Sequence, residues 1–103
     1  MSVLIKELGR AAGKLSKLIA DTKDPAEKQI LLDKYITISE QMEKTAHQQF
    51  EENDEFFLKV IKQIKKTKKE IQKYNAHQIE LFDLFKSLSQ LIESVFRVCL
   101  GWK

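Results

Sequence analysis

Apolar residues recur at alternating intervals of four and three residues along the chain. At about 100° per residue, this spacing places their side chains along one side of an α-helix. The first series comprises Leu4, Leu8, Ala11, Leu15 and Leu18. The second comprises Leu31, Tyr35, Ile38 and Met42, widened by Leu32, Ile36, Ala46 and Phe50. Each series predicts a helix that packs its apolar side against a partner.

Two further series occupy the second half of the chain. The third comprises Phe57, Val60, Ile61, Ile64 and Ile71. The last comprises Leu81, Phe85, Leu88, Ile92, Val95 and Cys99, with Leu84, Leu91 and Val98 on one side and Phe82, Phe96 and Leu100 on the other. This last apolar arc spans roughly 200°, about twice the width expected of a surface helix. The last helix is therefore either the centre of a bundle or half of an interface.

The clearest boundary between helices is Asp24 followed by Pro25. Aspartate is favoured as an N-cap and proline at the first helical position, and Glu27 completes a start that resembles a capping box. We expect one helix to end near Ala20 and the next to begin at Pro25.

Two weaker boundaries follow. Asn53, within the acidic segment 51–55, is a candidate cap, but nothing there forbids a helix, so residues 26–74 form either one long helix or two. Asn75 either ends one helix or caps the next, which predicts a last helix from about Ala76 to Cys99, before Gly101.

Composition agrees with an all-α fold in a single domain, residues 1–103. The chain has 103 residues, of which 43% are hydrophobic and 32% charged, with one proline and three glycines. Its size suits one domain. The patterns predict an antiparallel bundle of three or four helices, with a long central helix and oligomeric, coiled-coil-like packing as further options.

The single cysteine, Cys99, rules out an internal disulfide and gives no support to export into an oxidising compartment. Charged residues, beginning with Lys6 and Glu7, interrupt any signal-peptide core or membrane span near the start. We expect no transmembrane segment and a cytoplasmic protein.

The segment KVIKQIKKTKKEIQK, residues 59–73, holds seven lysines and one acid in fifteen residues. Five of the lysines point away from the apolar side of their predicted helix. These five, which we name the lysine stripe, are Lys59, Lys62, Lys66, Lys69 and Lys73. Lys68 instead falls on the apolar side, where it either snorkels to solvent or forms a polar contact that sets the register.

Charge is segregated along the chain. Residues 21–56 carry ten acidic and four basic side chains, whereas residues 57–75 carry seven basic and one acidic. An acidic helix lying beside a basic one would shield part of this charge, although both charged stripes face outward in a simple hairpin. The lysine stripe is then a solvated surface, a site for an acidic protein, or a site for nucleic acid or an anionic membrane surface.

Catalytic and metal-binding patterns are incomplete. Glu43, His47 and Glu51 are spaced by helical turns, and His77 with Glu80 forms a second partial set. A di-iron bundle requires more ligands, on several helices. No Ser–His–acid arrangement is evident, and Cys99 lies in an apolar series, where a thiol is a poor nucleophile. We expect no enzyme activity, no cofactor and no metal.

The function expected from the sequence is protein binding, as in a small adaptor, assembly factor or export-chaperone-like protein. The expected partners are another protein and a second copy of the chain, with a dimer favoured. The candidate interface residues are Leu84, Phe85, Leu88, Leu91, Ile92, Val95 and Phe96. Each of them has packing inside the bundle as its alternative. The alternative function is binding of nucleic acid or an anionic membrane surface through the lysine stripe.

Overall fold

The computed structural model describes residues 3–47 and 55–99, apart from the side chain of Phe56. The described part is an all-α bundle without strands. Its helices are α1 (Val3–Asp21), α2 (Pro25–Thr45), α3 (Glu55–Asn75) and α4 (Leu81–Cys99). The open choice for residues 26–74 is thereby resolved, because α2 and α3 are two helices rather than one.

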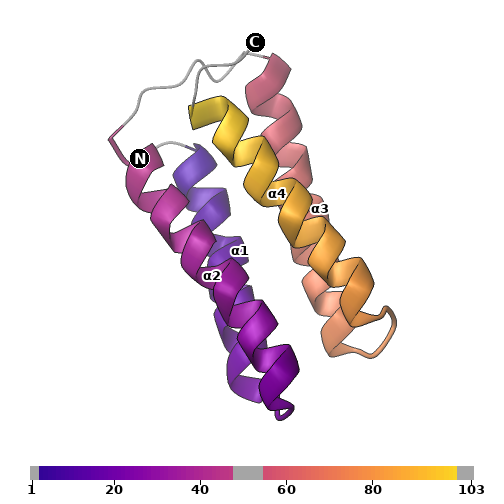
Figure 1. Cartoon of the computed structure of the whole chain (residues 1–103). Helices are drawn as coiled ribbons and strands as arrows, with labels where there is room; N and C mark the ends of the chain where they lie inside the picture. Colours follow the sequence, from indigo (N-terminus) through magenta and orange to yellow (C-terminus); the bar gives the residue numbers. More distant parts are fainter. Residues whose placement is uncertain (1–2, 48–54, 100–103) are drawn as a thin grey trace.

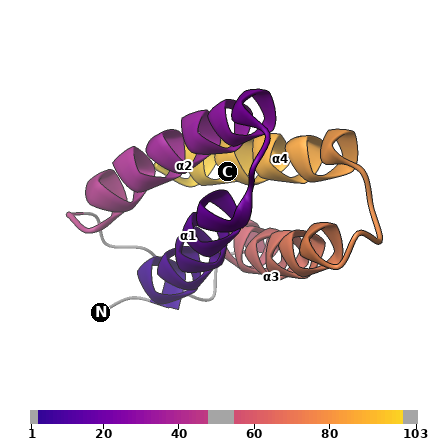
Figure 2. The same cartoon turned by 90° about the horizontal axis from the view of Figure 1, so that it is seen from below.

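The helices form two antiparallel hairpins that lie side by side (Figures 1 and 2). The first hairpin consists of α1 and α2, and the second of α3 and α4. Between the hairpins, α1 packs against α3 and α2 packs against α4, and each of these pairs runs parallel. Although α2 and α3 are consecutive, they occupy opposite corners of the bundle.

The start of α2 confirms the expected cap. The Asp24 carboxylate accepts a hydrogen bond of 2.9 Å from the backbone N–H of Ala26, and Pro25 is the first helical residue. This bond satisfies one of the backbone donors that a helix start leaves open. The preceding helix ends at Asp21, one residue after the expected position.

The expected start of the last helix near Ala76 is wrong, because a Schellman motif ends α3 there. His77 adopts a left-handed conformation with φ of 60°. Its N–H donates to the Tyr74 carbonyl at 3.0 Å, and the N–H of Gln78 donates to the Lys73 carbonyl at 2.8 Å. These two bonds satisfy terminal carbonyls of α3 and turn the chain away from the helix axis.

The last helix starts after this turn, at Leu81. The Asp83 carboxylate reaches back to accept a hydrogen bond of 3.3 Å from the backbone N–H of Glu80. This is the reciprocal half of a capping box, in which the third helical residue satisfies the N-cap donor. The segment around residues 76–80 is therefore a structured connection between α3 and α4.

The core confirms most of the apolar series. All five residues of the first series are buried, as are all five of the third. The second series is partly wrong, because Ile36 and Ala46 are exposed, whereas Gln41 and Thr45 are buried. The reason is that α2 turns its buried side toward α4 as well as α1. Phe50 lies outside the described residues.

A polar contact crosses the seam between α1 and α3. Lys68 Nζ lies 2.8 Å from Glu7 Oε2, and the side chains are only 18% and 10% exposed. This confirms a polar contact for Lys68 within the apolar side of its helix. The hydrogen bond from Lys68 holds the pKa of Glu7 below its ordinary value of 4.5, and the charges of Arg10 and Lys65 add to this effect, although burial opposes it.

We expect the Glu7→Leu substitution to destabilise the protein by about 1–3 kcal/mol, because it leaves the largely buried Lys68 ammonium without its hydrogen-bond partner. The double variant Glu7→Leu/Lys68→Met removes both charges and should lie within about 1 kcal/mol of the unsubstituted protein. Urea unfolding measures the free energy of unfolding of both variants. A double variant as unstable as the single one would contradict a coupled pair.

Acid titration gives a second readout of the same pair. The Glu7 carboxyl has a pKa near 4.5 in the unfolded protein and a lower pKa in the folded protein. The stabilisation by the pair is therefore fully present above pH 4.5 and is lost as the pH falls through the pKa of the folded protein. The stability difference between the unsubstituted protein and Glu7→Leu should therefore shrink at acidic pH. A difference that does not change with pH would mean that the carboxylate is not held by Lys68.

Candidate functional site

The structure divides the seven candidate interface residues of α4 into two groups. Leu84, Leu88, Leu91 and Val95 are completely buried in the core of the bundle. Ile92 is half-buried, and Phe85 and Phe96 are 40% and 53% exposed. Only the second group remains available to a partner while the bundle is folded.

A fourth exposed side chain extends this second group. Phe82 is 72% exposed, and at about 100° per residue it lies on the same side of α4 as the others. We name these four residues the apolar flank: Phe82, Phe85, Ile92 and Phe96. The sequence analysis placed Phe82 beside the apolar arc but not among the interface residues. The apolar arc of α4 is too wide for one neighbouring helix to cover, and Phe82 lies at its outer edge. This position was the signal that could have identified Phe82.

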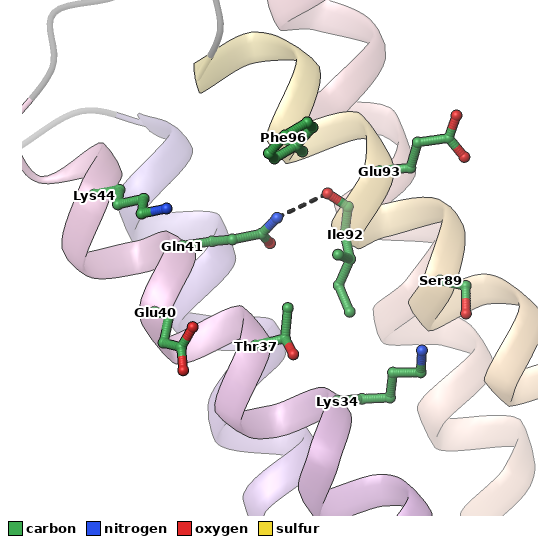
Figure 3. Close-up of a pocket in the computed structure, with 9 residues that line it drawn as sticks. All are labelled: Lys34, Thr37, Glu40, Gln41, Lys44, Ser89, Ile92, Glu93 and Phe96. Atoms are coloured by element: carbon green, nitrogen blue, oxygen red, sulfur yellow. Dashed lines mark hydrogen bonds between the residues drawn. The ribbon is translucent and has the colours of Figure 1, made fainter.

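The apolar flank borders a groove between α2 and α4 (Figure 3). The groove has a volume of about 360 Å³. Its walls are formed by Lys34, Thr37, Glu40, Gln41 and Lys44 from α2 and by Ser89, Ile92, Glu93 and Phe96 from α4. The rim therefore carries both signs of charge, and α4 supplies the aromatic wall.

Gln41 links the two walls of the groove. Its Nε2–H donates a hydrogen bond of 2.8 Å to the backbone carbonyl of Ile92 (Figure 3). Its Oε1 is buried and has no hydrogen-bond partner in the described structure. Gln41 is only 8% exposed, and the apolar periodicity did not indicate it, because it is a polar residue beside Met42.

A cation lies against the apolar flank. The Lys34 ammonium is 4.3 Å from the centre of the Phe85 ring. A cation–π contact at an exposed site contributes about 0.5–1 kcal/mol. Lys34 therefore joins α2 to the apolar flank and covers one face of the Phe85 ring, while part of Phe85 stays exposed.

The five side chains of the lysine stripe are all exposed. Lys59 lies 3.8 Å from Glu55, one turn earlier on the same helix. The acidic helix α2 does not lie beside α3 and so cannot shield the lysine stripe as a neighbour, because the two helices occupy opposite corners. The neighbour that α3 has instead is α1, whose own exposed residues include Lys6, Arg10 and Lys17.

The histidine, cysteine and acidic side chains of residues 3–47 and 55–99 form no group of three or more that could hold a metal ion. Glu51 of the partial set around His47 lies outside this range. Burial raises the pKa of the Cys99 thiol, which keeps it protonated and weakly nucleophilic at neutral pH. None of the helices in this part of the chain is long and apolar enough to span a membrane.

Comparisons with protein-family models, curated protein sequences and solved structures found no match to this chain.

We expect Gln41→Leu to change the free energy of unfolding by less than about 1 kcal/mol. The substitution removes one hydrogen bond but also an unpartnered buried oxygen, and the Ile92 carbonyl keeps its place in the α4 ladder. Urea unfolding tests this, with Ile38→Ala as the control, because truncating that buried side chain costs about 2–5 kcal/mol. A loss above about 2 kcal/mol for Gln41→Leu would show that the amide is needed for folding.

Proposed function

We propose that the protein is a non-enzymatic protein-binding module, of the adaptor, assembly-factor or export-chaperone type, and that the apolar flank of α4 is its contact surface. The observation that carries the proposal is the exposure of Phe82, Phe85 and Phe96 along one side of a helix that borders a groove. The single cysteine supports a cytoplasmic location, where thiols stay reduced.

Phe82, Phe85, Ile92 and Phe96 share one side of α4, unlike apolar residues scattered singly over a surface. Single exposed apolar residues need no explanation, but a contiguous apolar patch marks an interaction site. Phe82 and Phe96 are fourteen residues apart, which corresponds to about 21 Å of helix. This length suits a helix-to-helix contact, in which aromatic residues supply most of the binding energy.

The partner that this flank fits is a second copy of the same chain. Phe82 and Phe96 each lie seven residues from Ser89, a small residue that also lines the groove. An antiparallel contact between two copies of α4, with its two-fold axis at Ser89, pairs Phe82 of one copy with Phe96 of the other. The small side chain at the axis lets the two helices approach closely.

Charges beside the flank agree with the same arrangement. Lys86 lies three residues before Ser89 and Glu93 four residues after it. In the antiparallel contact, Lys86 of one copy therefore comes near Glu93 of the other. Such pairs at a rim add little affinity but favour the antiparallel orientation over the parallel one.

The test is the oligomeric state of the double variant Phe82→Ser/Phe96→Ser. Two exposed aromatic residues per copy are lost from the contact, so we expect the dissociation constant of the dimer to rise at least about a hundredfold, which corresponds to about 2.7 kcal/mol. Sedimentation equilibrium measures this, and circular dichroism should show unchanged helix content, because both side chains are exposed.

The matched control is Ile36→Ser/Leu58→Ser. These side chains are 47% and 50% exposed, but they lie on α2 and α3, away from the apolar flank. The control should keep the dimer. An unsubstituted protein that stays monomeric at high micromolar concentration, or a control that dissociates as much as the flank variant, would refute the proposed contact.

A further inference from the structure

The side of the bundle formed by α1 and α3 carries two rows of cations. The two helices are parallel neighbours (Figures 1 and 2), and their contact is marked by the pair of Glu7 and Lys68. At about 100° per residue, six basic side chains lie on the flanks of α1 and α3 that border this contact. They form what we name the cationic face: Arg10, Lys14 and Lys17 on α1 and Lys62, Lys65 and Lys69 on α3.

Little negative charge offsets this face. Its central acid, Glu7, is only 8% exposed and is already engaged by Lys68 at 2.8 Å and by Arg10 at 3.1 Å. Asp21, also on this flank of α1, is the last residue of the helix. The helix α2 lies within the acidic segment 21–56 and is at the opposite corner from α3. The two rows therefore present a largely uncompensated positive charge.

The geometry of the rows suits a regular polyanion. Along each helix the cations recur every three or four residues, which is about 4.5–6 Å. Axes of packed helices are about 8–10 Å apart, so the two rows can contact phosphates on both sides of a duplex groove, which is about 6–12 Å wide. Duplex DNA carries one negative charge per about 1.7 Å of its axis.

We propose that the cationic face binds the phosphate backbone of double-stranded nucleic acid, without reading its sequence. Five of the six side chains are lysines, which supply point charge but no bidentate recognition of bases. Single strands are bound on exposed aromatic rings, and the described side chains of this face include none. The proposed dimer contact borders the groove between α2 and α4, whereas the cationic face lies on α1 and α3, so the two sites are separate.

An anionic membrane fits the observations less well. Interfacial binding uses apolar side chains that insert among the headgroups beside the basic ones. Two exposed apolar residues on this side, Val3 and Leu58, lie near the starts of α1 and α3 rather than among the six cations. The cationic face offers charge without such anchors in its centre.

The experiment measures binding of the full chain to a short fluorescent DNA duplex by anisotropy over a series of salt concentrations. Six phosphate contacts give a slope of log K against log salt of about −5. The variants Arg10→Gln/Lys14→Gln/Lys17→Gln and Lys62→Gln/Lys65→Gln/Lys69→Gln each remove three contacts. Each should bring the slope to about −3 and weaken binding at low salt at least about tenfold. Duplexes of different sequence should bind equally.

The matched control removes the same charge from outside the cationic face, as Lys23→Gln/Lys28→Gln/Lys44→Gln. Lys28 and Lys44 are exposed on α2 and Lys23 is exposed just before that helix, and the control should keep the slope of the unsubstituted protein. The proposal is overturned if the duplex does not bind at low salt. It is also overturned if the control loses as much affinity for the duplex as the two variants do, or if the α1 variant loses no affinity. Binding to phosphatidylserine vesicles without binding to the duplex would also overturn it, in favour of a membrane surface.

Discussion

A single carboxylate, Glu7, lies in the seam between α1 and α3, where Lys68 holds it at 2.8 Å and Arg10 at 3.1 Å. A largely buried charge is tolerated only with a partner, so this seam favours α1 as the neighbour of Lys68 and disfavours arrangements that leave either group alone. The contribution of such a pair to stability is small compared with the apolar core. Any arrangement that separates α1 from α3 would leave both charges without this partner, so the pair penalises such arrangements.

The distribution of charge and apolar surface follows from that choice of neighbours. Because α3 lies beside α1, the positive charges of these two helices lie on the same side of the bundle. The helix α2 lies at the corner diagonal to α3. The other side of the molecule is formed by α2 and α4, with the groove, the partly exposed rings of α4 and charges of both signs at the rim. One bundle thus presents two chemically different surfaces on opposite sides.

The sequence predicted the elements better than their arrangement. Periodicity identified the buried residues of α1 and α3, and Asp24 with Pro25 marked the start of α2, because these signals are local. Nothing in periodicity indicates which helix covers a given apolar side, so the diagonal position of α2 and α3 was not predicted. The turn at His77 was also missed. Residues other than glycine rarely adopt the left-handed conformation, and the several-fold enrichment of histidine there is too weak a signal to predict a turn from the sequence.

The candidate site shows the same limit. Leu84 and Phe85 belong to one apolar arc, yet Leu84 is buried and Phe85 is 40% exposed, because a single residue step of about 100° moves a side chain from the core to the surface. A methyl NOESY spectrum of the folded protein distinguishes this arrangement of the helices from the alternative one. We expect cross-peaks between methyl groups of α1 and α3 and between those of α2 and α4. Cross-peaks that instead join α2 to α3 and α1 to α4 would contradict the arrangement and, with it, the separation of the two surfaces.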